Sequence, residues 1–296
     1  MGRILGFMNS RKVAPFVFLT PFMTIFLVFK VWPVIQAINM SFQRWQGMQS
    51  QTYVGLDNYE RVFRLANFEK ALTNTTLYTI GTLLVLIPLP LVLAVLLDSR
   101  RVMKATFFRA VIFLPALTSL VVAGTVFRLV LAREGFLNSA IELVGLPPSR
   151  WLEKANLALP SLILIATWRW TGINMLYFNA GLVNIPRELY DAASIDGASP
   201  LQTFWNVTLP LLKPTTLFVV VLSVIGGYQV FVEPFIIFDG GGGPGNSALS
   251  MAILIYRTGF TSFEFGTAAA MGVVLAAIIL IVSLTQFRLF GTFEKE

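Results

Sequence analysis

The stretch YDAASIDGASPLQTFWNVTLP, residues 190–210, is polar and carries two carboxylates, yet it lies between two segments that are almost wholly apolar. Its residues predict two short helices joined by a turn. The first runs through ELYDAASID, with Asn184 as its cap and Pro186 in its first turn, and stops at Gly197. The residues SPLQ at 199–202 have the pattern of a capping box, which begins a second helix, LQTFWNVT, that is expected to end before LP at 209–210. The stretch therefore predicts a water-facing helical hairpin inside a very apolar chain.

The remainder of the chain has the composition of a membrane protein. Of its 296 residues, 56% are hydrophobic and 12% are charged, whereas soluble domains carry roughly 25% charged residues. A helix needs about 20 apolar residues to cross the hydrocarbon, and six segments are long enough: 14–40, 74–97, 107–131, 157–183, 213–237 and 264–288. The sequence therefore predicts an all-α integral membrane protein, a single domain over 1–296 in which six transmembrane helices pack as a bundle.

The basic residues predict how these segments are oriented. The first segment is too long for a signal peptide and no small-residue cleavage site follows it, so it is expected to be an uncleaved anchor. With the N-terminus inside, the cytoplasmic segments hold more Lys and Arg than the outer ones, and SRRVMKATFFR at 99–109 alone has four. This bias places both termini and the loop 184–212 in the cytoplasm.

Several classes of function are disfavoured by what the sequence lacks. It contains no Cys and no His, which removes disulfides, thiol nucleophiles, Cys/His zinc sites and imidazole acid–base chemistry. The run GGGGP at 240–244 lacks the Gly-Lys-Ser/Thr of a phosphate-binding loop, and LQTFWNVT carries no charge to read DNA. We therefore expect no enzymatic activity, no metal or cofactor bound by this chain, and no nucleic-acid partner.

The fourth segment carries polar residues at helical spacing. In TWRWTGINMLYFNAG, 167–181, Trp170, Asn174 and Tyr177 share one helix face. Aromatic rings suit the C–H faces of a sugar and an amide suits its hydroxyls, although helix packing around a satisfied amide is the alternative. Arg169 lies near mid-depth, where a basic side chain costs roughly 2.5–3.5 kcal/mol and usually faces the bundle interior or a cavity.

The fifth segment adds Tyr228, Gln229 and Glu233 to this candidate substrate pathway. We expect Glu233 to form a structural ion pair with Arg128 of the third segment, with direct contact to a solute as the alternative. Gly226-Gly227 could break the helix and open a path, as unwound helices do in transporters.

The hairpin also resembles a known motif. Asp191-Ala192-Ala193, three residues, Gly197, nine residues, Val207, one residue and Leu209-Pro210 resemble the EAA loop of binding-protein-dependent ABC importer permeases, E-A-A-x3-G-x9-I-x-L-P. The chain departs from it in having Asp for Glu and Val for Ile. Other segments look like the sugar-uptake branch, on the side of maltose permease F and glycerol-phosphate permease A: 54–63, 74–79, 107–117, 135–152 and 242–260. Asp239 stands where that branch usually has a hydroxyl residue.

The resemblance implies a type I importer permease with defined partners. The EAA loop of that family is a coupling helix seated on a cytoplasmic ATPase, so Asp191 would be a polar anchor, Gly197 would form the turn, and Ala192 and Ala193 would permit close approach. The implied partners are a second homologous permease, two ATP-binding subunits that hold ATP and Mg, and an extracytoplasmic solute-binding protein docked on the outer loops, about 42–72, 132–156 and 239–262.

The resemblance also implies a location and a class of solute. The location would be a bacterial or archaeal cytoplasmic membrane. The solute would be an oligosaccharide, a disaccharide or a related polyol, moved by alternating access. Glycerol 3-phosphate is the alternative solute, because Arg169 and Arg128 could serve a phosphate.

Two other classes stay open on the sequence. A secondary transporter or channel usually shows internal repeats or relays of intramembrane carboxylates, whereas this chain has one candidate carboxylate and no obvious repeat. A membrane enzyme would need a catalytic constellation, and none is evident.

Overall fold

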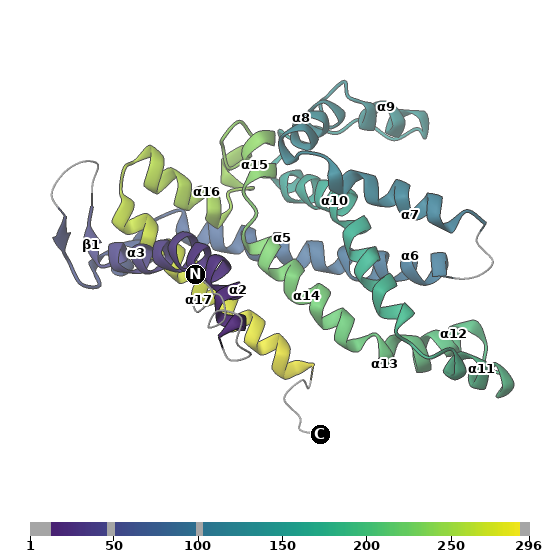
Figure 1. Cartoon of the computed structure of the whole chain (residues 1–296). Helices are drawn as coiled ribbons and strands as arrows, with labels where there is room; N and C mark the ends of the chain where they lie inside the picture. Colours follow the sequence, from purple (N-terminus) through teal and green to yellow (C-terminus); the bar gives the residue numbers. More distant parts are fainter. Residues whose placement is uncertain (1–12, 46–50, 99–102, 291–296) are drawn as a thin grey trace, which may run out of the picture. The chain divides into compact units, whose positions relative to one another are not determined.

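The computed structural model describes residues 13–45, 51–98 and 103–290, and these are helical for most of their length (Figure 1). The chain packs as two compact units, one formed by the residues up to Arg64 with Ile255–Val274, the other by Leu65–Leu254 with the residues from Leu275. The expected single permease domain stays a prediction. Both chain ends, and Arg100 and Arg101 of the basic loop, lie outside the described residues.

The first unit begins with a long apolar helix. Its parts are α2 (Ala14–Phe26), the π-helical turn η1 (Leu27–Val31) and α3 (Trp32–Ser41). An antiparallel pair follows, β1 (Gln43–Arg44) with β2 (Thr52–Tyr53), in which Gln43 lies opposite Tyr53. The unit is completed by α4 (Asp57–Arg64), by η5 (Arg257–Thr261) and by the start of α17 (Phe265–Leu289). No side chain of α2 or η1 is buried, as expected of a surface that faces lipid or another subunit.

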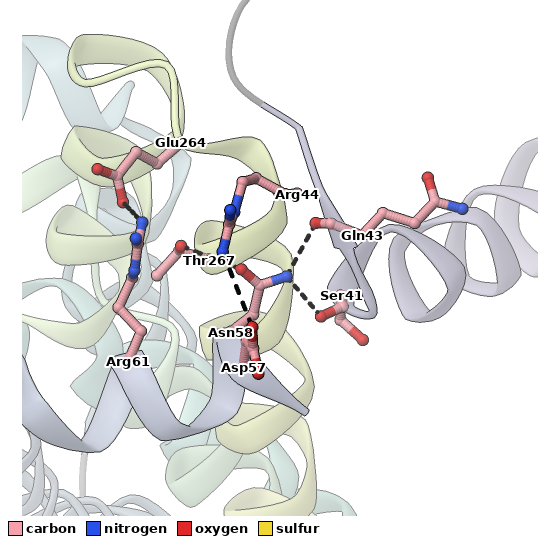
Figure 2. A network of polar contacts seen from close by, with 8 residues as sticks. All are labelled: Ser41, Gln43, Arg44, Asp57, Asn58, Arg61, Glu264 and Thr267. Carbon is pink, nitrogen blue, oxygen red and sulfur yellow. Dashed lines mark hydrogen bonds and ion pairs between the residues drawn. The ribbon is translucent and has the colours of Figure 1, made fainter. Parts of the chain in front are cut away.

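A buried asparagine holds this unit together, as Figure 2 shows. Asn58 is 5% exposed, and its amide donates hydrogen bonds to the carbonyl oxygens of Ser41 at 2.9 Å and Gln43 at 2.8 Å. Its Oδ1 accepts from Thr267 at 3.4 Å. One side chain thus joins the end of α3, the start of α4 and the first turn of α17.

We expect Asn58→Ala to lower the free energy of unfolding by about 2 kcal/mol, because one buried and one partly buried carbonyl lose their donor. The midpoint of thermal unfolding in detergent, followed by tryptophan fluorescence, measures the change. Arg61→Ala is the control. It removes an ion pair with Glu264 (3.3 Å) in the same unit, with side chains 44% and 33% exposed, so it is expected to cost no more than about 1 kcal/mol. Equal shifts of the unfolding midpoint in the two variants would contradict the role of Asn58 in holding this unit together.

The second unit contains the remaining helices. Its elements, in chain order, are α5 (Phe68–Leu86), α6 (Pro88–Asp98), α7 (Ala105–Phe113), η2 (Leu114–Leu117), α8 (Leu120–Val130), α9 (Phe136–Leu143), α10 (Ala155–Val183), α11 (Arg187–Ile195), α12 (Pro200–Thr203), η3 (Phe204–Thr208), α13 (Leu209–Leu211), α14 (Lys213–Tyr228), α15 (Val232–Ile237), η4 (Pro244–Asn246) and α16 (Met251–Tyr256), whose last two residues fall in the first unit.

Helix α10 is the centre of this unit. It packs along α5 and α6, while α14 packs on α5 and α15 on α8 (Figure 1). Met175 and Phe178 of α10 are fully buried in one apolar cluster, and Leu162 and Ile165 in another. A Cβ at Gly172 would lie 2.3 Å from the carbonyl oxygen of Ile112, so glycine is what lets α7 approach α10 this closely.

The six-span prediction is not confirmed. Among the described residues, four helical stretches are long and apolar enough to cross a membrane: Ala14–Ser41, Phe68–Asp98, Lys213–Ile237 and Phe265–Leu289. Helix α10 has 29 residues but is not one of these four stretches, because its polar residues, Arg169 and Asn174 among them, lower its hydropathy.

The predicted segment 107–131 is not one straight helix. Ala105–Leu117 and Leu120–Val130 are bent by 98°, so they make a fifth span only if the bent pair is counted as one. The chain turns there because Pro115 cannot donate a helical hydrogen bond and because Thr118 and Ser119 have extended ψ angles of 144° and 136°.

Candidate functional site

The polar stretch at 190–210 forms the predicted hairpin. Helix α11 ends at Ile195, and Gly197, whose φ of +72° is in the left-handed region, forms the turn that follows. Ala198 N donates across this turn to the carbonyl of Ala193 at 2.9 Å. The capping box is present in both directions: Gln202 N donates to Ser199 Oγ at 3.3 Å, and Ser199 N donates to Gln202 Oε1 at 2.8 Å. The angle between α11 and α12 is therefore fixed by the left-handed glycine and the cap.

Two details of the hairpin differ from the prediction. The amide of Asn184 donates to the carbonyl of Ala180 at 3.1 Å, so it closes the end of α10, and α11 begins after Pro186 with no side-chain cap. The second helix does not end before Leu209 but continues to Leu211. It widens into the π-helical turn η3, where Leu209 N bonds Phe204 O, and this wider turn accommodates the missing donor of Pro210.

The hairpin presents an apolar surface with a carboxylate beside it. Ile195, Leu201 and Trp205 are 86%, 67% and 58% exposed. Of the residues in the matched motif, Asp191, Ala192, Gly197 and Pro210 are exposed, whereas Ala193, Val207 and Leu209 are half-buried. A hydrogen bond of 3.2 Å between the hydroxyls of Tyr190 and Thr208 ties the two helices together. A rigid surface of this kind suits contact with another protein.

A cavity of about 410 Å³ lies between α5, α10 and α14, within the size range of small-molecule sites. It is lined by three of the predicted residues of α10, Trp170, Asn174 and Tyr177, and by Gln229 and Glu233. Its other lining residues are Tyr78, Thr82, Leu86, Leu120, Ala166, Ile173, Leu222, Ser223, Gly226, Gly227, Val230, Phe231 and Val232. The cavity thus combines an indole, a phenol ring, amides and hydroxyls.

Asn174 has a structural partner as well as a place in the cavity wall. Its amide donates to the carbonyl of Leu86 at 3.1 Å, the oxygen that Pro90, lacking an N–H, cannot bond within the helix. Its second contact, with Ser223 Oγ, is at the 3.5 Å limit. The amide thus bonds a carbonyl that the proline break between α5 and α6 leaves free, as expected if Asn174 serves helix packing. Asn174 also lines the cavity, so it has both a packing contact and access to a solute.

Two predicted pathway residues do not line the cavity. Arg169 is 9% exposed and donates to the carbonyl oxygen of Thr118. Tyr228 is 6% exposed, and its hydroxyl lies 3.2 Å from Thr76 Oγ1, which links α14 to α5. Both residues hold helices beside the cavity.

The predicted ion pair between Arg128 and Glu233 is wrong. Arg128 instead binds both carboxylate oxygens of Asp239, because packing of α15 on α8 brings the residues after α15 to the end of α8. Glu233 is 6% exposed and faces the cavity.

The predicted break at Gly226-Gly227 is also displaced. Helix α14 continues to Tyr228, and α15 begins at Val232. Gly227 serves close packing instead, since a Cβ there would lie 2.6 Å from Thr79 Oγ1.

Three polar residues of the cavity were not predicted, namely Tyr78, Thr82 and Ser223. Tyr78 and Thr82 are one helical turn apart, and that spacing was an available signal, although the neighbouring Asn74, Thr75, Thr76 and Thr79 made it less distinct. Ser223 lies one turn from Gly226 and Gly227, but a single serine in an apolar helix more often bonds its own backbone.

Comparisons with known proteins agree on one family. Residues 63–291 match the family described as binding-protein-dependent transport system inner membrane component. The arabinooligosaccharides transport system permease protein AraP of Halalkalibacterium halodurans is 45% identical over 295 residues, covering 99% of this chain and 92% of that protein. The protein of the same name from Bacillus subtilis is 43% identical over 289 residues, covering 97% and 91%.

A solved structure shares the fold. A chain in the crystal structure of a bacterial ABC transporter involved in the import of the acidic polysaccharide alginate matches with a TM-score of 0.81 and 22% identity, over 99% of this chain and 100% of that one.

Proposed function

The chain belongs to the family of binding-protein-dependent transport system inner membrane components, and we propose that it is the permease subunit of an ATP-driven importer of carbohydrates. The cavity between α5, α10 and α14 carries this proposal. Trp170 and Tyr177 offer aromatic faces, and Asn174, Ser223 and Gln229 offer hydrogen-bonding groups, the combination that a ring with many hydroxyls needs. The names of the two relatives, both arabinooligosaccharide permeases, support an oligosaccharide as the solute.

We further propose that the hairpin 190–210 couples the permease to ATP hydrolysis on separate subunits. Its exposed apolar side chains and the rigid turn at Gly197 support a contact that transmits a rigid-body movement. Closure of the ATPase pair would move this hairpin and switch the cavity between the two sides of the membrane. ATP and Mg would be held by those subunits, and this chain would bind no cofactor of its own.

Asp191→Lys is expected to reduce ATP-driven uptake strongly without affecting membrane insertion. Asp191 is exposed, and no described residue forms an ion pair with it, so its carboxylate is available to a partner and its reversal leaves the fold intact. Uptake of labelled oligosaccharide by cells measures the effect. Asp196→Lys, the same change five residues along the hairpin at a position that the matched motif leaves variable, is the control. Equal uptake by both variants would remove Asp191 from the proposed contact.

The proposed partners are a second permease, two ATP-binding subunits and an extracytoplasmic solute-binding protein, assembled in a bacterial or archaeal cytoplasmic membrane. The family description supports the solute-binding protein. Gentle affinity purification of the tagged chain, with its companions identified by mass, tests the assembly. A second permease and an ATP-binding subunit are expected. Recovery of the chain alone, still able to move solute in vesicles without ATP, would favour a secondary transporter.

A further inference from the structure

The charge of the cavity wall is entirely negative. Among the described residues that line it, Glu233 has the only charged side chain, and the other polar groups are neutral hydroxyls and amides. Glu233 is 6% exposed, so its carboxylate acts in surroundings that screen charge poorly.

Neither candidate arginine lines the cavity beside this carboxylate. The guanidinium of Arg169 donates to Thr118 and lies 5.3 Å from the Trp170 ring centre. It attracts Glu233 electrostatically but is not part of the lining. Arg128 is bound by Asp239 at a second hollow. A phosphate or carboxylate entering the cavity would therefore meet a negative charge, with no basic side chain among the described lining residues to bind it.

The carboxylate of Glu233 also retains unused hydrogen-bonding capacity. Its own backbone N–H donates to it, and no side chain in the described parts of the chain adds a second donor. An ionised carboxylate only accepts hydrogen bonds and has room for about four of them, so one backbone donor leaves most of its accepting capacity unused. Sugar hydroxyls are donors that would satisfy it, whereas an anionic group brings only further acceptors and a like charge.

We propose that Glu233 is a specificity-determining residue that makes the cavity accept neutral, hydroxyl-rich solutes and reject anionic ones such as uronates and sugar phosphates. The inference rests on the proposed function, since it takes the cavity to be where the transported solute binds. Beyond the proposed carbohydrate site, it states that the permease itself discriminates against negatively charged solutes. This selection would act in addition to any made by a solute-binding protein.

Equilibrium binding to the purified importer complex in lipid nanodiscs, without its solute-binding protein, tests the proposal. The probes are the disaccharide glucosyl-xylose and its uronate, glucuronosyl-xylose, which differ only in a CH₂OH group against a carboxylate. The wild-type complex is expected to bind the neutral disaccharide at least roughly tenfold more tightly. Glu233→Gln, which keeps the size and removes the charge, should bring the ratio of the two affinities close to one by tightening uronate binding.

The matched control is Glu142→Gln, the same chemical change at an exposed carboxylate on α9, which should leave the ratio at its wild-type value. Equal wild-type affinities, or a ratio that Glu233→Gln does not change, would overturn the role of Glu233 while leaving the carbohydrate site standing. If the Glu233→Gln variant fails to assemble, the ratio of the two affinities in the wild-type complex still tests the role of Glu233. Binding of neither disaccharide to the wild-type complex would overturn the proposed carbohydrate site and this inference with it.

Discussion

Gly197→Val is expected to abolish ATP-driven uptake while the chain still inserts into the membrane. The φ of +72° at this position is in the left-handed region, which a β-branched residue adopts only at a cost of roughly 1–2 kcal/mol. The substituted turn would relax to another angle and displace α12 from α11. No atom lies within 4 Å of a Cβ placed there, so the defect should stay in the hairpin and not spread to the transmembrane helices.

Gly197→Asn is the matched control for this prediction. Asparagine is also a medium-sized side chain, but it enters the left-handed region more readily than most residues. It should therefore retain much of the uptake that valine loses. The measurement is uptake of labelled oligosaccharide at equal amounts of membrane-inserted protein. Normal uptake by the valine variant would contradict the assignment of this turn to coupling.

Gly226→Trp is expected to reduce uptake to the background measured without ATP, through a different mechanism. Gly226 lines the cavity, and a Cβ there would meet nothing within 4 Å. A large side chain could therefore enter the space proposed for the solute without displacing a neighbouring helix. Tryptophan also has a higher helix propensity than glycine, so α14 should persist. Binding of a neutral disaccharide to the purified complex should be lost together with uptake.

The control for the cavity prediction is Gly272→Trp. Gly272 is also a glycine within a long apolar helix, α17, with nothing within 4 Å of its added Cβ, but it does not line the cavity. This variant should retain disaccharide binding. Wild-type binding and uptake by Gly226→Trp would mean that the solute passes elsewhere.

The sequence predicted those features that depend on local rules. The turn at Gly197 and the capping box at Ser199 follow from residue types at fixed spacing, and both are present. Trp170, Asn174 and Tyr177 share a face because of the helical period alone, and all three line one cavity. The family assignment from the spacing around Gly197 is borne out by the match over residues 63–291.

The predictions that failed depended on tertiary contacts. The partner of Arg128 is set by the packing of α15 on α8, which brings Asp239 to it and turns Glu233 inward. The 98° bend after Leu117 could not be seen in hydropathy, because an apolar segment looks the same whether it is straight or bent. Asn184 fits the end of one helix as well as the start of the next, and only the fold decides between them.

The proposed activity of this chain is the ATP-driven movement of carbohydrate. Its most direct test is uptake of labelled arabinotriose into proteoliposomes that contain the co-purified complex, with the solute-binding protein outside and ATP inside. Accumulation that requires hydrolysable ATP, and that fails with Gly197→Val, is the predicted result. Accumulation driven by an ion gradient without ATP would contradict ATP-driven import and identify the chain as a self-sufficient transporter.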